Sequence, residues 1–152
     1  MFRQSRKVAP APPSLATLPN GSFRGSTRHR ETNEDTAWEK LNMHFCPTTV
    51  DPFGPGNVIG FGRSLYRDNT FPFVLAGTYR YNGGKMLQGQ LLKIYLDLAF
   101  GHIVYSFHQR AASAEGRTSP LELSSSVSTG AIELVSSFVA PIVPFSGPAF
   151  HL

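Results

Sequence analysis

The feature that most constrains the fold is the apolar stretch at residues 71–102, the part of the chain densest in large apolar side chains. Within it, five side chains recur at the i, i+4, i+7, i+8 and i+11 spacing of an amphipathic helix: Leu87, Leu91, Ile94, Tyr95 and Leu98. Gly101 follows them, and a residue free to take positive φ is common just past the end of a helix. This pattern predicts a helix over residues 85–100.

The same residues also show an alternation of period two, which is typical of a strand. Leu92, Ile94, Leu96, Leu98 and Phe100 alternate with Lys93, Tyr95, Asp97 and Ala99. Gly89 weakens the helix by about 1 kcal/mol relative to alanine. We favour the helix and keep the strand as the alternative. Under either interpretation we expect Leu91 and Leu98 in the core and Lys93 at the surface.

Strands are predicted on both sides of this segment. In the earliest of them, Leu41, Met43 and Phe45 alternate with polar residues, so one face is apolar. The predicted strands are residues 40–50, 71–81 and 103–109, with two short strands within 121–139 that join near Gly130. The expected fold class is therefore α+β, an antiparallel sheet packed with one or two helices.

A chain of 152 residues has room for one domain. Its 14 glycines and 12 prolines argue for many turns and against an all-helical bundle, while its 12 phenylalanines can fill a core. We expect a disordered, basic, Pro-rich N-terminal arm over residues 1–35. Residues 36–152 are expected to form a single compact α+β domain that ends in an extended Pro-containing segment.

The net charge of +4 is concentrated near the N-terminal end. Residues 1–30 contain no acidic side chain and six basic ones: Arg3, Arg6, Lys7, Arg24, Arg28 and Arg30. Such a segment attracts polyanions, either the phosphates of RNA or an anionic membrane surface. The alternative is a tail that only keeps the protein in solution.

Residues 51–63 are predicted to form a flexible loop because they are rich in glycine. The spacing of these glycines matches neither a phosphate-binding loop nor a dinucleotide-binding fingerprint. Four apolar side chains in this segment are candidates for contact with a membrane or a partner: Phe53, Val58, Ile59 and Phe61. Burial under the protein's own core is the alternative.

No local motif marks a catalytic residue, so we expect no enzymatic activity and no cofactor. His44 with Cys46, and His102 with His108, would each share one face of a strand, but neither pair has the spacing of a metal site, and no metal is expected.

Cellular location is indicated by three features of the sequence. The single cysteine excludes an intramolecular disulfide, as is usual in a reducing compartment. No apolar run is long enough for a membrane-spanning helix, and the basic N-terminal end lacks the apolar centre of a secretory signal. Cytosolic or nuclear residence is therefore expected over secretion.

Several segments carry a resemblance to a known family. Residues 75–80 (LAGTYR) and 84–87 (GKML), with the leucine-rich run that follows, combine a glycine-containing turn, basic residues and an apolar segment. Residues 130–134 (GAIEL) match a Gly-x-Ile-Glu-Leu pattern. Together with the basic arm, this order of features resembles the small matrix proteins of rhabdoviruses, including plant-infecting members. Residues 12–15 (PPSL) depart from the PPxY budding motif.

The resemblance implies a viral structural protein that condenses ribonucleoprotein, self-associates into a homo-oligomer and binds a membrane surface peripherally. It also implies residence in the virion and in the host cytoplasm or nucleus. The alternative function is a β-rich module that binds a small ligand or a protein and carries an incidental basic tail. In that case Tyr79, Tyr81 and Tyr105 would line a barrel.

Overall fold

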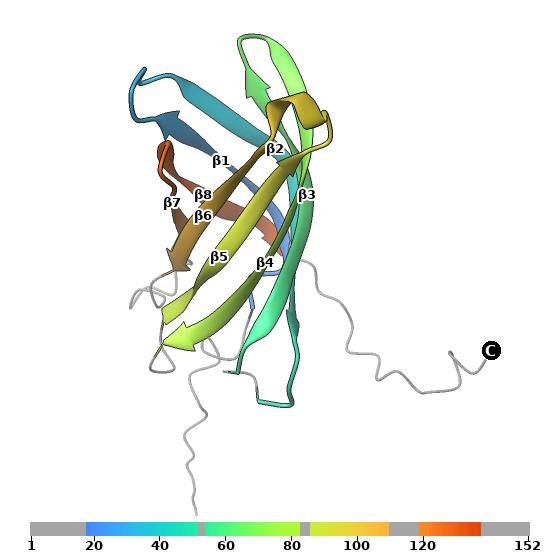
Figure 1. Ribbon diagram of the computed structural model, residues 1–152. Coiled ribbons are helices and arrows are strands. Elements are labelled where there is room, and N and C mark those ends of the chain that lie inside the picture. Colours follow the sequence, from blue (N-terminus) through green and yellow to red (C-terminus); the bar gives the residue numbers. More distant parts are fainter. Residues whose placement is uncertain (1–17, 52–53, 83–85, 110–118, 138–152) are drawn as a thin grey trace, which may run out of the picture.

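The computed structural model describes residues 18–51, 54–82, 86–109 and 119–137. In them the chain forms eight antiparallel strands, each paired with its neighbours in sequence, and the last strand pairs with the first to close a barrel (Figure 1). The strands are β1 (Gly21–His29), β2 (Asp35–Pro47), β3 (Gly56–Tyr66), β4 (Asn69–Asn82), β5 (Met86–Tyr95), β6 (His102–Gln109), β7 (Leu121–Ser124) and β8 (Ser128–Ser137).

The fold is all-β, so the α+β prediction is wrong. Residues expected to form a helix build β5 and then a three-residue 3-10 turn, η2 (Leu98–Phe100). Leu87 and Leu91 are four residues apart and therefore share one face in a strand as well as in a helix. None of the helical segments in the described ranges is long and apolar enough to cross a membrane.

The alternative prediction of a strand was correct for residues 86–95, but the face expected to be apolar, with Leu92 and Ile94, is not the one that faces the barrel interior. On β5 the interior positions are Leu87, Leu91 and Lys93, while Leu92 and Ile94 are only partly buried on the other face. Lys93 is 1% exposed and Leu98, in η2, is 83% exposed. Both residues are therefore the opposite of what was expected.

Strands were also predicted over residues 71–81, 103–109 and 40–50; the first two lie within longer strands, and the third ends at residue 47 rather than 50. Residues 71–81 belong to β4, residues 103–109 belong to β6, and residues 40–47 belong to β2. A bulge at Lys40, whose φ is 53°, lets Trp38 and Leu41 both face inward although they are three residues apart. The bulge explains why simple alternation from Leu41 does not reach Trp38.

At the C-terminal end of the barrel, two short strands were expected to join near Gly130. Strands β7 and β8 are present, but the turn between them lies at residues 125–127 and Gly130 is inside β8. A side chain at Gly130 would meet the carbonyl oxygen of Ser26 on β1, so the glycine permits a close approach of two strands rather than a turn.

The loop predicted over residues 51–63 is also wrong, because most of it is β3. Gly56, Val58, Gly60 and Gly62 occupy alternate positions of this strand and therefore face the interior. The ring of Tyr79 occupies the space that a side chain at Gly56 would need. Glycine here makes room for large side chains of the neighbouring strands.

Residues 21–29, which were assigned to the N-terminal arm over residues 1–35, form β1 between β2 and β8. Residues 1–17 and the Pro-containing segment after residue 137 lie outside the described residues.

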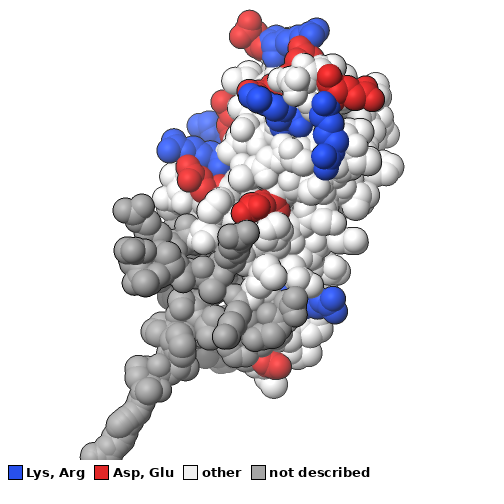
Figure 2. Space-filling view, turned by 90° about the vertical axis from the view of Figure 1, so that its left-hand side faces the viewer, with Lys and Arg blue, Asp and Glu red and all other residues white. Residues whose placement is uncertain are grey.

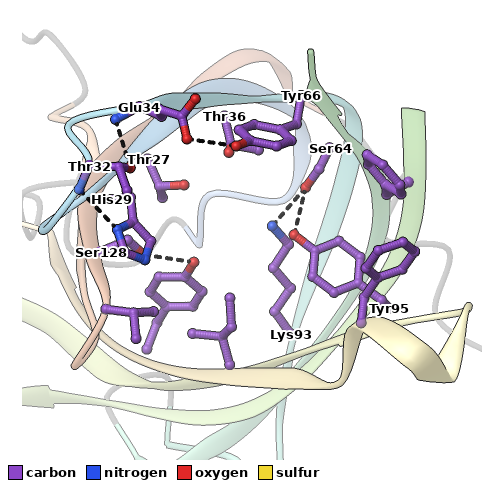
Figure 3. A pocket seen from close by; sticks show the side chains of 15 residues that line it. Thr27, His29, Thr32, Glu34, Thr36, Ser64, Tyr66, Lys93, Tyr95 and Ser128 are labelled. Atoms are coloured by element: carbon purple, nitrogen blue, oxygen red, sulfur yellow. Dashed lines mark hydrogen bonds between the residues drawn. The ribbon is translucent and has the colours of Figure 1, made fainter. Parts of the chain in front are cut away.

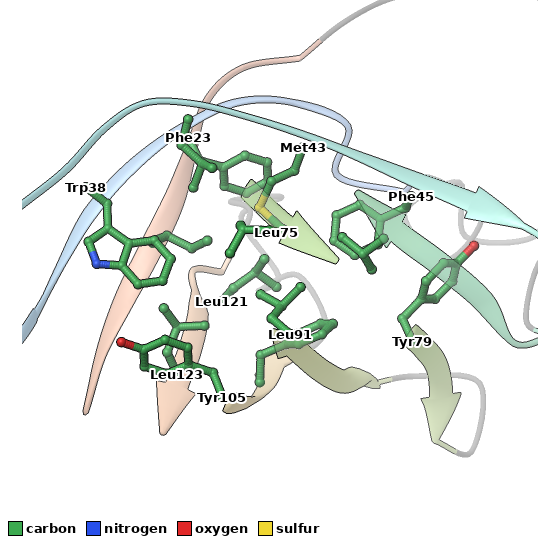
Figure 4. Close-up of a cluster of buried hydrophobic side chains, with 14 of the residues drawn as sticks. Phe23, Trp38, Met43, Phe45, Leu75, Tyr79, Leu91, Tyr105, Leu121 and Leu123 are labelled. Carbon is green, nitrogen blue, oxygen red and sulfur yellow. The ribbon is translucent and has the colours of Figure 1, made fainter. Parts of the chain in front are cut away.

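The core fills one half of the barrel interior, and three of its aromatic residues, Trp38, Phe73 and Tyr105, also border the other half. Figure 4 shows side chains from all around the barrel pointing toward one another there. The buried set comprises Phe23, Trp38, Leu41, Met43, Phe45, Val58, Phe73, Leu75, Tyr79, Leu87, Leu91, Tyr105, Phe107, Leu121, Leu123 and Ile132. We refer to this end, from Leu41 and Leu91 toward Tyr79, as the closed half.

Candidate functional site

The other half of the interior holds a cavity of about 440 Å³, which we call the open half (Figure 3). It lies at the end where the β1–β2, β3–β4, β5–β6 and β7–β8 turns meet. Its lining mixes aromatic, aliphatic and polar side chains: Thr27, His29, Thr32, Glu34, Thr36, Ser64, Tyr66, Phe71, Lys93, Tyr95, Phe100, Ile103, Tyr105, Val127 and Ser128. The volume is within the range of small-molecule sites, roughly 300–1,000 Å³.

Lys93 points into this cavity from β5, as Figure 3 shows. Its Nζ donates a hydrogen bond to Ser64 Oγ at 2.7 Å. The same nitrogen lies 4.1, 4.5 and 4.8 Å from the ring centroids of Trp38, Phe73 and Tyr95. The amine is therefore held inside a box of three aromatic rings.

Two electrostatic effects act on this amine in opposite directions. Burial lowers the pKa of Lys93 from its ordinary value of 10.5 to about 7, because the ammonium form loses its hydration. The faces of the rings favour the charged form. No carboxylate in the described part of the chain forms an ion pair with Lys93. We therefore expect the charged and neutral forms to exchange near neutral pH.

Glu34 lines the cavity at its rim and is already engaged. Its carboxylate accepts a hydrogen bond from the Tyr66 hydroxyl at 2.7 Å and pairs with Arg67. The hydrogen bond from Tyr66, and to a lesser extent the one from Arg67, holds the pKa of Glu34 below its ordinary value. The three residues tie the β1–β2 turn to the β3–β4 turn, and Arg67 balances the charge of this carboxylate.

Hydroxyl groups extend the polar contacts across the site. Ser64 Oγ also lies 3.3 Å from the Tyr95 hydroxyl, so Lys93, Ser64 and Tyr95 form a continuous chain. On the other wall, the Tyr105 hydroxyl lies 3.2 Å from Ser128 Oγ. Burial raises the pKa of Tyr105, so its hydroxyl stays protonated at neutral pH.

This arrangement can hold a small, flat, mostly apolar molecule with one polar end. The aromatic side chains supply contact area, and the Lys93 amine supplies hydrogen-bond donors at the inner end. An ammonium group has three N–H donors, and the hydrogen bond to Ser64 uses one.

A second hollow, of about 860 Å³, lies at the other end of β4–β6. Thr78, Gln90 and Ser106, which are exposed on the outer face of the barrel, form part of its lining. Its lining also includes Tyr79 and Phe107, which are buried in the core.

Of the six basic residues expected to bind polyanions, the three in the described part of the chain each contact other residues of the barrel. Arg3, Arg6 and Lys7 lie outside the described residues. Arg24 pairs with Glu133, Arg28 pairs with Asp35, and Arg30 donates to the Ser125 carbonyl and to Ser124 Oγ. On the face shown in Figure 2, acidic and basic side chains lie side by side toward one end. Polyanion binding by the six residues stays a prediction.

The apolar candidates for membrane or partner contact that the structure describes differ in exposure. Val58 is buried in the core, whereas Ile59 and Phe61 are 54% and 57% exposed on the outer face of β3. Phe53 lies outside the described residues. The pairing of β3 to β6 places Ile59 in one row with Ala76, Leu92 and Val104. Contact of this outer face with a membrane or a partner stays a prediction.

The residues considered as metal ligands are not gathered into a site. His44 and Cys46 are exposed on β2, and His108 lies 3.4 Å from Glu122. Within the described ranges, no group of three or more His, Cys, Asp or Glu side chains is placed to hold a metal ion.

Sequence reasoning missed Lys93, the residue on which the site depends. A usable signal was present, since Leu87, Leu91, Lys93 and Tyr95 all fall on odd positions of one strand. Tyr105, named for a barrel lining, does line the cavity; Tyr79 is buried in the closed half, and Tyr81 packs against the core.

No protein-family model matches the chain, and no curated protein matches it either. Two solved structures are similar in fold. A redesigned β-barrel shares 15% identity with a TM-score of 0.53, covering 81% of this chain and 96% of its own. The redesigned β-barrel mFAP1, bound to DFHBI, shares 16% identity with a TM-score of 0.52, covering 79% and 98%.

These findings correct the expected function. The closed all-β barrel differs from the α+β domain that the resemblance to rhabdovirus matrix proteins implied, and none of the comparisons links the chain to that family. The matrix-protein function is therefore wrong, and the chain has the fold of a β-barrel.

Proposed function

We propose that this protein binds a small, largely apolar ligand in the open half of the barrel, with an oxygen atom of the ligand held by Lys93. The observation that carries the proposal is a buried amine at the inner end of a cavity lined by aromatic rings. The similarity to a barrel whose structure contains a bound small molecule, DFHBI, supports it.

The chemistry of the site selects the class of ligand. Rings such as Phe71, Tyr95 and Phe100 offer apolar contact, and a buried apolar surface stabilises a complex by about 25 cal/mol per Å² before the costs of association. A carboxylate or carbonyl oxygen near Lys93 would accept a charge-assisted hydrogen bond, worth about 1.5–3 kcal/mol. An apolar ligand with a cationic end would be repelled.

Isothermal titration calorimetry with three matched naphthalene compounds tests this selection. The compounds carry a carboxylate, a methyl group or a trimethylammonium group at the same ring position. We expect the carboxylate to bind about tenfold tighter than the methyl compound at pH 6, the cation to bind least, and the preference for the carboxylate to shrink at pH 9 as Lys93 loses its proton.

The variant Lys93→Met keeps the shape of the side chain and removes its donors. It should lower the affinity for 2-naphthoate about tenfold and leave the affinity for 2-methylnaphthalene unchanged. Tyr79→Phe, in the closed half, is the control and should alter neither. Failure of all three compounds to bind at millimolar concentration would refute the proposal.

Other expectations stay predictions beside this proposal. They are the absence of enzymatic activity, contact with RNA or an anionic membrane, formation of a homo-oligomer, and residence in cytoplasm or nucleus.

A further inference from the structure

We propose that Lys93 forms a reversible covalent imine with an apolar aldehyde bound in the open half of the barrel. This inference rests on the proposed function, and it names the reactive group of the ligand. The proposal is supported by the route to the Lys93 amine, the environment that favours its neutral form, the hydroxyl groups beside it and the contrast with the exposed Lys40.

Access to the amine is through the cavity. Lys93 is almost fully buried, yet its amine lies at the inner end of the cavity in the open half. A molecule therefore reaches Nζ by passing Tyr66, Phe71 and Phe100, which also line the cavity. An aldehyde that enters with its apolar part against these rings presents its polar end to the amine. The aromatic box around Nζ then limits the directions from which the carbonyl carbon can approach.

Reactivity requires a neutral amine, because an ammonium group has no free electron pair. The apolar surroundings of Lys93 and the lack of an ion-paired carboxylate in the described part of the site favour the neutral form. The hydrogen bond with Ser64 leaves the amine nitrogen in a fixed position. Lysines desolvated in this way serve as nucleophiles toward carbonyl groups.

The reaction balances without any further reactant. The Nζ electron pair forms a bond to the carbonyl carbon, and the carbonyl π electrons move to oxygen. A proton passes from nitrogen to that oxygen and gives a carbinolamine. The carbon–oxygen bond then breaks as the leaving oxygen takes up a second proton, the nitrogen gives up its remaining proton to replace it, and water departs as the C=N bond forms. The products are one imine and one water molecule.

Proton transfer has a path in the site. Ser64 Oγ contacts both Nζ, at 2.7 Å, and the Tyr95 hydroxyl, at 3.3 Å. These hydroxyls can accept the proton released by nitrogen and return it to the leaving oxygen. The apolar walls exclude bulk water and so slow hydrolysis of the imine.

The chain provides its own control among its lysines, which are Lys7, Lys40, Lys85 and Lys93. Lys40 is exposed at the β2 bulge, whereas Lys93 is buried. At pH 7 an ordinary exposed lysine is neutral in only about one molecule in a thousand or fewer. Selective reaction at Lys93 is therefore readily distinguished from general lysine chemistry.

The experiment treats the full-length protein with 2-naphthaldehyde at pH 7, traps the imine with sodium cyanoborohydride, and maps the adduct by peptide mass spectrometry. We expect labelling of Lys93 to be at least about a hundredfold faster than labelling of Lys40, because the neutral fraction of the two amines differs by at least several hundredfold at pH 7. Excess 2-naphthoate should slow labelling at Lys93 alone. Lys93→Met should remove the fast reaction and Lys40→Arg should leave it intact.

The outcomes separate the two proposals. Equal labelling of Lys93 and Lys40 in the unmodified sequence would overturn the imine, whether or not the variants fold. Binding of 2-naphthoate without labelling of Lys93 would overturn the imine and leave ligand binding in place. No binding by any naphthalene compound would overturn both.

Discussion

The two halves of the barrel interior are built on the same strands but contain different side chains. In the closed half, inward positions are almost all large and apolar, as with Leu41, Met43 and Leu91. In the open half, the same strands carry Thr27, Ser64, Lys93 and Ser128 on their inward faces. One strand, β5, changes from Leu91 to Lys93 within a single inward step.

The difference shows how one barrel supports both stability and a site. Each large apolar side chain buried in the closed half stabilises the fold by about 1.5–3 kcal/mol. A buried amine without a carboxylate partner costs stability instead. The closed half therefore allows the open half to keep a cavity and a partly uncompensated polar group.

The largest expected effect is at Leu91, in the closed half. Because Leu91 is fully buried, Leu91→Ala should lower the free energy of unfolding by about 2–5 kcal/mol. Leu98→Ala, at an exposed position, should change it by less than about 0.5 kcal/mol. Urea denaturation followed by the fluorescence of Trp38, the single tryptophan, measures both. Equal losses would mean that Leu98 is packed in solution.

A smaller effect of opposite sign is expected in the open half. Lys93→Met should raise the free energy of unfolding by about 1–4 kcal/mol at pH 6, since it replaces a buried ammonium with an apolar group of similar shape. A destabilised Lys93→Met protein would show that the aromatic rings more than offset the loss of hydration.

Lys93 should also make stability depend on pH. Its pKa is about 7 in the folded protein and 10.5 in the unfolded chain, so between these values the unfolded chain binds more protons. Stability should therefore rise from about pH 7 to pH 9, by at most about 1.4 kcal/mol per unit. Below pH 7 this contribution is constant. Lys93→Met should flatten the rise, which chemical denaturation at several pH values would reveal.

Two tyrosines give the smallest and most closely matched comparison. The Tyr105 hydroxyl is hydrogen-bonded to Ser128, whereas the buried Tyr79 hydroxyl has no hydrogen-bond partner among the described residues. Tyr105→Phe should lower stability by about 1 kcal/mol, and Tyr79→Phe should leave it unchanged or raise it slightly. Thermal unfolding of the two variants tests this, and a loss at Tyr79 as large as that at Tyr105 would contradict it.

Parts of the fold were predictable because local pattern and tertiary environment agree. Leu41, Met43 and Phe45 alternate in sequence and are all buried on β2. Around Leu87 and Leu91 the sequence was ambiguous, because a spacing of four suits a strand and a helix equally. The choice depends on pairing with β4 and β6, and these contacts are not visible in the local pattern.

The site was less predictable, for a related reason. Lysine is rarely buried, so Lys93 was assigned to the surface. Its position depends on Trp38, Phe73 and Ser64, which come from three other strands. Glycines at 56, 60 and 62 suggested a loop, although their even spacing matches the inward face of a strand.

Closure of the barrel by β1 and β8 has a consequence for how the chain folds. The seven other pairings join consecutive strands, but this pairing joins Gly21–His29 to Ser128–Ser137, about a hundred residues later. Hairpins can form early, and the closing ladder has to wait for both ends of the sheet to meet, which places such topologies among slow folders. Before β1 pairs with β8, the unpaired edges of these two strands can pair with other chains; once they pair with each other, those edges are no longer available. Aggregation during refolding should therefore compete with this last step.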